Sequence, residues 1–344
     1  MKRAFLAVSC LALMIAASIV PAAADEIADF YHGKTIRDVI GFGPGDSFDL
    51  YARLIAKYMG AHIPGEPTIV VQNMAGAGSL TALNYVTNSA PRDGTVIGMI
   101  NPVATIQPLL QPDLVKFDPR MLDWIGSIAT DYYTCGFWTA DKVSLKDLRL
   151  RQFIVGSTAT TGATYAGDMV FMSALHLNFK VVPGYGNMGE LNHAAERGEV
   201  QGHCGVMATT LKSTLWPVYT AGNLQIAVRA TLGSDSEFPD VPNAFDLVTS
   251  DEDRQVLLLL AGPWYYGRPM LAPPDLPKAR LAALRAGFDA TMKDQAFLDE
   301  AKNLRADIHP LTGAQVADTI RKIYEISPAV VARARPMFGV TDSK

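Results

Sequence analysis

Three turns rich in glycine, serine and threonine carry the residues best suited to hold a small ligand. They are Gly43-Pro44-Gly45, Ala75-Gly76-Ala77-Gly78, and a Ser/Thr/Gly segment from Gly156 to Thr164. Each is expected between a strand and a helix, where free backbone N–H groups and the positive end of the helix dipole meet. One such turn is ordinary strand-to-helix geometry, but three at corresponding places favour an anion site.

The first glycine turn could also suggest a dinucleotide site. Its glycines are Gly41, Gly43 and Gly45, which is not the Gly-x-Gly-x-x-Gly spacing of that motif. Position 61, about 20 residues further on, is Ala61 rather than the expected acid. The nucleotide interpretation is therefore weak.

Common catalytic and metal motifs do not occur in the sequence. It has no Gly-x-Ser-x-Gly, no His-Glu-x-x-His and no Cys-x-x-Cys. His193, His203 and Cys204 could approach a metal, but they lack a fourth ligand and a known spacing, so surface or strand-end positions are favoured. We expect no enzymatic activity, no cofactor and no metal.

The amino terminus has the pattern of an export signal. Met1-Lys2-Arg3 precedes an apolar stretch from Ala4 to Val20, which ends in Pro21-Ala22-Ala23-Ala24. A basic start, an apolar segment and an Ala-x-Ala site are typical of a secretory signal peptide. A membrane anchor is less favoured, because the stretch is near the short limit for a span. We predict that residues 1–24 are removed after Ala24 and that the protein works in the periplasm.

The remaining composition indicates an acidic, soluble, two-lobed protein. Without Lys2 and Arg3, 28 of the 30 basic residues remain against 34 acidic ones, a formal net charge of −6. No basic cluster is available to neutralise phosphates, so a nucleic-acid partner is not expected. About 320 mature residues exceed the usual size of one domain and suggest two.

Two cysteines remain after the predicted cleavage, which removes Cys10. Cys135 and Cys204 could pair, because the compartment beyond the inner membrane is oxidising. Two separately buried thiols are an equally good interpretation, since spacing alone does not show whether their Cα atoms come within bonding range.

The turns require strands before them and helices after them, and the chain supplies both. Short apolar runs alternate with amphipathic stretches, which favours an α/β fold with mostly parallel sheets. Strands are expected at 35–42, 68–71, 96–100, 153–155, 180–182, 200–204 and 256–266. Helices are expected at 48–59, at 79–87, from the end of the third turn through Leu175, and at 188–197. Three more are expected in the C-terminal part, the last from Thr312-Gly313 towards Arg335. Ser79 is placed to cap the second helix.

The first-lobe turns resemble signatures of one family, the solute receptors of tripartite tricarboxylate transporters, also called Bug or TctC proteins. Gly43-Pro44-Gly45-Asp46-Ser47-Phe48-Asp49, followed by Ala52-Arg53, is similar to its Pro-Gly-Gly-Ser-x-Asp and Ala-Arg signature. Val71 to Ser79 is similar to its Val-Glu-Asn-x-Pro-Gly-Ala-Gly-Gly, and Ala90 to Thr95 to its Ala-Pro-Asp-Gly-Tyr-Thr.

The resemblance covers nearly the whole mature chain. Gly156-Ser157 with Ala166-Gly167-Asp168 resembles the second-lobe turn, and Val182-Pro183-Gly184-Tyr185-Gly186 resembles a Val-Pro-Tyr-x-Gly motif. Gly198-Glu199-Val200 and Phe238-Pro239-Asp240-Val241-Pro242 also match.

The resemblance implies a two-lobed, type II periplasmic binding protein fold with a hinge between the lobes. Lobe one would be residues 33–129 plus 241–344, and lobe two 130–240. The resemblance further implies capture of a small carboxylate (a dicarboxylate, tricarboxylate or aromatic acid), delivery to membrane transporter subunits, and action as a monomer. The carboxylate would be held by backbone N–H groups and hydroxyls. The implied ligand-binding residues are Phe42, Gly45, Asp46, Ser47, Asp49, Gly76, Ala77, Gly78 and Ser79 in lobe one and Ser157, Thr158, Thr161, Thr164 and Tyr185 in lobe two.

Several residues depart from the family pattern. Asp46 stands where the family usually has a second glycine, so either its side chain points away or the ligand is less anionic or carries a donor group there. Asp49 could brace its turn or touch the ligand. Ala75 replaces a proline, and Gly184-Tyr185 reverses the usual order. Two rival functions stay open: a receptor that presents its ligand to a sensor kinase, and a periplasmic enzyme.

Overall fold

The computed structural model describes residues 20–115, 117–139, 142–160, 162–233 and 238–340. Within these ranges, no helix combines the length and the apolar character needed to cross a membrane. Most of the predicted signal peptide lies outside the described residues. Helix α2 (Val20–Tyr31) begins inside the predicted 1–24 segment and continues past it. Removal of that segment stays a prediction.

The chain folds into two compact units, and each is assembled from three stretches of sequence. The first contains the described residues up to Ile100, Met121–Ile128 and Pro269–Ala314, and the second contains Asn101–Arg120, Ala129–Arg268 and the described residues from Gln315 on. Each unit has its own mixed sheet with helices packed on it, so the predicted α/β fold is confirmed. The hinge and the lobe boundaries at residues 129/130 and 240/241 stay a prediction.

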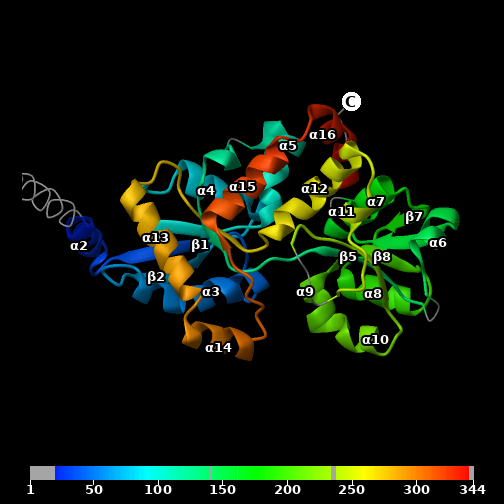
Figure 1. Cartoon of the computed structure of the whole chain (residues 1–344), viewed down its shortest axis with the longest axis horizontal. Coiled ribbons are helices and arrows are strands. Elements are labelled where there is room, and N and C mark those ends of the chain that lie inside the picture. Colours follow the sequence, from blue (N-terminus) through cyan, green and yellow to red (C-terminus); the bar gives the residue numbers. More distant parts are fainter. Residues whose placement is uncertain (1–19, 116, 140–141, 161, 234–237, 341–344) are drawn as a thin grey trace, which may run out of the picture. The chain divides into compact units, whose positions relative to one another are not determined.

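In the described part of the first unit, six strands form the sheet in the order β11-β4-β10-β3-β1-β2. The strands are β1 (Thr35–Ile40), β2 (Thr68–Asn73), β3 (Val96–Met99), β4 (Asp123–Ser127), β10 (Pro269–Ala272) and β11 (Leu311–Thr312). β1 pairs in parallel with both β2 and β3, whereas β10 and β11 run antiparallel to their neighbours. Because β1 and β2 are parallel neighbours (Figure 1), the turns that follow them leave the sheet at the same edge.

Helices cover the sheet of the first unit. They are α2, α3 (Ser47–Met59), α4 (Leu80–Asn88), α13 (Lys278–Thr291) and α14 (Gln295–Asn303). α3 packs on β1 and β2 through an apolar face that includes Phe48, Leu54 and Ile55, while α13 packs on β4 and α3 (Figure 1). The burial of this face fixes where α3 begins, and therefore where the turn after β1 lies.

The second unit is built on a sheet that, in its described residues, has five strands in the order β7-β6-β8-β5-β9. The strands are β5 (Tyr133–Phe137), β6 (Phe153–Ser157), β7 (Phe179–Pro183), β8 (Gly202–Met207) and β9 (Gln225–Ala230). β6 is parallel to β7 and β8, and β5 is antiparallel to β8 and β9. A disulfide joins Cys135 on β5 to Cys204 on β8, which decides between the two alternatives left open by the sequence.

The helices of the second unit differ widely in length. They are α5 (Gln107–Leu110), α6 (Leu145–Leu150), α7 (Ala163–Leu175), α8 (Met188–Glu196), α9 (Ala208–Thr210), α10 (Trp216–Thr220), α11 (Ala244–Leu247), α12 (Asp251–Tyr265), α16 (Pro328–Ala334) and most of α15 (Gly313–Tyr324). α7 packs on β6, β7 and β8 and also contacts α12. Its start is thereby held beside the turn that follows β6.

The strand expected at 256–266 is wrong, because this stretch belongs to helix α12. Ser250 caps the helix by accepting a hydrogen bond from the Asp253 backbone N–H at 3.0 Å, and its first turn is acidic. The apolar run after that turn is buried over much of its surface, so it lacks the polar face that would have revealed the helical period. The strand comes later, as β10.

Two further expectations are corrected. The sheets are mixed rather than mostly parallel, because β5, β10 and β11 run antiparallel to their neighbours. The expectation failed because β4, β5, β9, β10 and β11 were not recognised in the sequence. The last predicted helix is interrupted, and Ser327 caps a separate helix, α16, that begins at Pro328. A proline is tolerated at the first position of a helix but breaks a helix interior.

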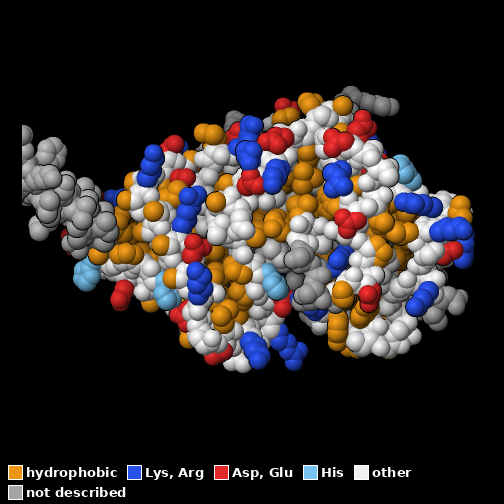
Figure 2. All heavy atoms as spheres, viewed as in Figure 1, with side chains coloured by type: hydrophobic (Ala, Val, Ile, Leu, Met, Phe, Trp, Pro, Cys, Tyr) orange, Lys and Arg blue, Asp and Glu red, His pale blue; other side chains and the backbone are white. Residues whose placement is uncertain are grey.

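Charged side chains of both signs are interspersed on the face of the molecule in Figure 2. Several form exposed pairs, such as Arg92 with Asp275 and Arg197 with Glu199, each at 2.8 Å. Exposed pairs of this kind contribute about 0–1 kcal/mol each. The stability of each unit therefore rests on its buried core and not on these pairs.

Candidate functional site

The turn after β1 carries an acidic residue that caps the following helix. Asp46 has an extended backbone, and its Oδ1 accepts a hydrogen bond from the Phe48 backbone N–H at 2.9 Å. Aspartate is favoured here because its carboxylate complements the helix dipole. One N-terminal amide of α3 is therefore already bonded to a carboxylate of the chain.

Asp49 braces the same turn from the first turn of α3. Its side chain is buried, and its carboxylate accepts hydrogen bonds of 2.9 Å from Arg53 Nε, from the Gly45 backbone N–H and from Asn73 Nδ2. The bond from Arg53, followed by those from Gly45 and Asn73, lowers the pKa of Asp49 to about 2 against the opposing effect of burial. These bonds hold Asp49 ionised and fixed, as expected of a bracing residue.

Asn73, at the end of β2, ties the two neighbouring turns together. Besides its bond to Asp49, its Nδ2 donates to the Phe42 carbonyl at 3.0 Å, and its Oδ1 accepts from Arg53 at 3.1 Å. The Phe42 ring stacks on Phe48 with centroids 4.0 Å apart. Sequence reasoning placed Arg53 and Asn73 in matching motifs but gave them no role. Arg53 bonds Asp49 on its own helix, whereas Asn73 bonds residues of other elements.

The turn after β2 contains a run of residues with positive φ. The φ angles are 149° at Gly76, 45° at Ala77, 63° at Gly78 and 78° at Ser79. Glycine adopts such angles at little cost, whereas Ala77 and Ser79 carry strain. Strain of this kind persists where the surrounding structure imposes it, and it gathers at functional sites.

Ser79 does not cap α4 with its side chain, so that expectation is wrong. The φ of Ser79 is 78°, and its hydroxyl donates to the carbonyl of Gly41, the residue that follows β1, at 3.0 Å. A Cβ on Gly41 would lie only 2.2 Å from the Ser79 hydroxyl oxygen. Gly41 is therefore required by the contact between the two turns.

Other glycines in these turns face open space. A Cβ added to Gly43, Gly45 or Gly78 would meet no atom within 4 Å. The backbone at these positions is therefore accessible to a molecule that approaches closely. In the first unit the structure brings the predicted residues of both turns together at one edge of the sheet.

The third turn lies in the second unit, after β6. The Thr158 backbone N–H donates to Thr164 Oγ1 at 2.9 Å, and the backbone N–H of Tyr185 donates to the Ser157 carbonyl at 3.3 Å. These four predicted residues thus gather at the ends of β6 and β7, while Thr161 lies outside the described residues. Ser157 Oγ is buried and has no hydrogen-bond partner in the described ranges. An unsatisfied buried hydroxyl is costly, and a bound polar group would satisfy it.

Among the described residues, no group of three His, Cys, Asp or Glu side chains could hold a metal. Cys204 is in the disulfide, and His193 pairs with Glu196 at 2.8 Å. His203 is buried beside Asn192, with Nε2 to Oδ1 at 3.0 Å, and burial lowers its pKa to about 3. The alternative of a metal at His193, His203 and Cys204 therefore has no geometric support.

Two α/β units, each with its own mixed sheet and with small-residue turns at the ends of parallel strands, define a class of fold, the two-lobed fold of periplasmic binding proteins. No family model matches the chain, but two relatives match it in sequence. A UPF0065 protein of Bordetella pertussis is 23% identical over 296 residues, covering 83% of this chain and 85% of the relative. A UPF0065 protein of Cupriavidus necator is 26% identical over 253 residues, covering 71% and 72%.

Solved structures agree on the fold. A TctC solute-binding protein from Polaromonas, without ligand, has a TM-score of 0.71 at 15% identity and covers 88% of this chain and 99% of its own. MatC from Rhodopseudomonas palustris, solved with bound malate, has a TM-score of 0.54 at 18% identity, covering 89% and 98%. The periplasmic binding protein BugD has a TM-score of 0.52 at 20% identity, covering 90% and 96%. This chain has the fold of the TctC and Bug solute-binding proteins, and the resemblance found in its sequence is confirmed.

Proposed function

We propose that this protein captures a small carboxylate in the periplasm and delivers it to the membrane subunits of a tripartite tricarboxylate transporter. The main support for this proposal is the pair of adjoining turns after β1 and β2, whose backbone faces open space at Gly43, Gly45 and Gly78. Backbone N–H groups at helix starts hold carboxylates without lysine or arginine. The shared fold with MatC, solved with malate, supports a ligand of this class.

The proposed site uses residues from both units. In the first unit they are Phe42, Gly45, Asp46, Ser47, Asp49, Gly76, Ala77, Gly78 and Ser79. In the second they are Ser157, Thr158, Thr161, Thr164 and Tyr185, whose hydroxyls would hold the other end of the ligand. The predicted hinge between the lobes would close around it.

The charges near the first turn narrow the ligand class. Asp46 and Asp49 bring two negative charges and Arg53 one positive charge, so this turn repels an anion. The turn after β2, from Ala75 to Ser79, contains no ionisable side chain. We therefore place a ligand carboxylate at the turn after β2 and a hydroxyl or amine of the same ligand near Asp46.

Substitution at Gly78 tests this placement. Gly78→Leu puts a side chain where the carboxylate would lie and should weaken binding of mono- and dicarboxylates such as lactate and malate at least tenfold. Isothermal titration calorimetry of the mature protein measures the affinity. Gly222→Leu is a matched control, because Gly222 also has positive φ, 78°, and open space around its Cβ position. Equal losses in both variants, or binding of neutral solutes alone, would refute the placement.

The rival functions predict different results with the same protein. An enzyme would convert the bound acid, which mass spectrometry of the ligand after incubation would detect. A receptor for a sensor kinase would bind the acid without increasing its uptake into vesicles that carry the transporter subunits. Uptake that depends on added protein supports the transport role.

A further inference from the structure

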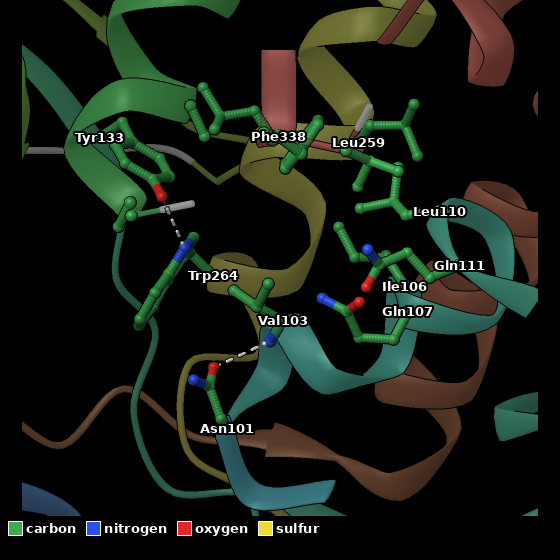
Figure 3. Close-up of a pocket in the computed structure, with 16 residues that line it drawn as sticks. Asn101, Val103, Ile106, Gln107, Leu110, Gln111, Tyr133, Leu259, Trp264 and Phe338 are labelled. Atoms are coloured by element: carbon green, nitrogen blue, oxygen red, sulfur yellow. Dashed lines mark hydrogen bonds between the residues drawn. The ribbon is translucent and has the colours of Figure 1, made fainter. Parts of the chain in front are cut away.

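A pocket of about 250 Å³ lies within the second unit and touches the third turn only at its end, at Gly162 and Ala163. It is bounded by the 3₁₀ turn Pro102–Ile106, helix α5, the start of α7, the last turns of α12 and the C-terminal Phe338 to Val340 (Figure 3). None of the described residues proposed to hold the carboxylate lines it.

The walls of this pocket combine an apolar part with uncharged polar groups. The apolar part is formed by side chains such as Ile106, Leu110, Leu259 and Phe338 (Figure 3). Of the described residues that line it, none is Lys, Arg, His, Asp or Glu. An ion inside would lose its hydration without gaining a charged partner, so the pocket selects against carboxylates.

Two glutamine side chains supply a polar end. Gln107 and Gln111 lie one helical turn apart, since the Gln111 backbone N–H donates to the Gln107 carbonyl at 2.7 Å. In Figure 3 both amide groups point into the pocket. Neither amide hydrogen-bonds another side chain in the part of the chain that the structure describes. Together they offer donors and acceptors to a bound molecule.

A second polar group lies across the pocket. The Tyr133 hydroxyl accepts a hydrogen bond from Trp264 Nε1 at 3.2 Å, which does not use its own proton (Figure 3). Burial raises the pKa of Tyr133, which keeps that proton in place. The side chain of Asn101 bonds to the backbone instead: its Oδ1 accepts a hydrogen bond from the Val103 N–H at 3.0 Å.

We propose that this pocket is a second ligand site, which takes an uncharged molecule with one ring or a short apolar body and a carbonyl, amide or hydroxyl group. Its volume exceeds that of an engineered apolar cavity of about 150 Å³ that holds benzene. It is smaller than the pockets of about 300–1,000 Å³ that hold drug-sized ligands. The apolar body contacts the walls, and the polar group bonds the amides of Gln107 and Gln111.

Benzamide and benzoate test the proposal, because they share a ring and differ in charge. Calorimetric titration of the mature protein with benzamide should show saturable binding, and malate at saturating concentration should not displace it. The variant Gln107→Leu/Gln111→Leu should bind benzamide about tenfold more weakly, through loss of its hydrogen bonds. Gln152→Leu, at an exposed glutamine of the same unit, should bind it as the wild type does.

A second variant fills the volume of the pocket and leaves the two glutamines unchanged. Ala166 is buried on α7 and lines the pocket, so Ala166→Leu should abolish benzamide binding while circular dichroism reports the native fold. Absence of benzamide binding to the wild type, its displacement by malate, or retained affinity in Ala166→Leu would each overturn the proposal. An equal loss of benzoate and benzamide affinity in the double glutamine variant would overturn the selectivity for uncharged molecules.

Discussion

At the scale of single residues, Asp38 has a carboxyl group inside the apolar core of the first unit. It lies on β1, on the same face as Ile36 and Ile40, and both of its carboxyl oxygens are buried without a hydrogen-bond partner in the described ranges. Burial raises the pKa of Asp38 from 3.8 to about 7. At a pH between these two values, the folded protein keeps this carboxyl protonated, whereas the unfolded chain has released the proton.

We expect the stability that depends on Asp38 to fall as the pH rises. The folded pKa is raised, so the contribution is fully present below about pH 4 and is lost as the pH passes about 7, a change of about 4 kcal/mol in unfolding free energy from this group. Asp38→Asn removes the titrating group, so the unfolding free energy of the variant minus that of the wild type should be larger at pH 8 than at pH 5. Urea unfolding of both proteins at both pH values measures this difference. Asp240→Asn, at an exposed position, controls for the lost charge, and parallel pH curves for Asp38→Asn and the wild type would contradict the assignment.

At the scale of elements, Asp46 at the start of α3 has two opposing effects, one on helix stability and one on ligand binding. Asp46 stabilises the helix as its N-cap, and the same negative charge opposes an anionic ligand at the turn. Residues with a side-chain oxygen are interchangeable as caps, but only the aspartate carries a charge. Substitutions at this position therefore separate the two effects.

Asp46→Asn should keep the cap and lower the repulsion, so carboxylate affinity rises while stability changes little. Asp46→Ala should lose about 1 kcal/mol of unfolding free energy, because the Phe48 N–H loses its acceptor. Urea unfolding and calorimetric titration with malate measure the two effects. If Asp46→Asn weakened malate binding, the negative charge of Asp46 would favour the ligand, and the proposed repulsion of anions at this turn would be wrong.

At the scale of the whole molecule, the disulfide restricts the unfolded chain. Cys135 and Cys204 are fully buried and 69 residues apart, and a loop of this length corresponds to about 4 kcal/mol of lost loop entropy. Cys135→Ala/Cys204→Ala should lose a stability of that order, measured by urea unfolding against the oxidised wild type. The reduced wild type is the control, and it should match the double variant. Two free thiols in the unfolded, non-reduced protein would contradict the pairing.

Much of the strand-turn-helix framework could be predicted from the sequence, because local patterns determine it. The parallel strands β1, β2 and β3, helix α3 and the glycine turns follow from apolar period, turn residues and capping residues close together in the chain. The α/β class and the resemblance to TctC and Bug proteins were available from the same short segments. The candidate residues of each turn were found in this way.

Only the tertiary structure decided the features that depend on distant partners. The apolar run in α12 fits a buried helix or a buried strand equally well, since burial on nearly all sides removes the period. The interleaved segments of the two units, the pairing of Cys135 with Cys204, and the bonds of Asn73 and Ser79 join residues far apart in the sequence. Local sequence sets propensity and turn chemistry, but packing sets which elements meet and which polar groups they must satisfy.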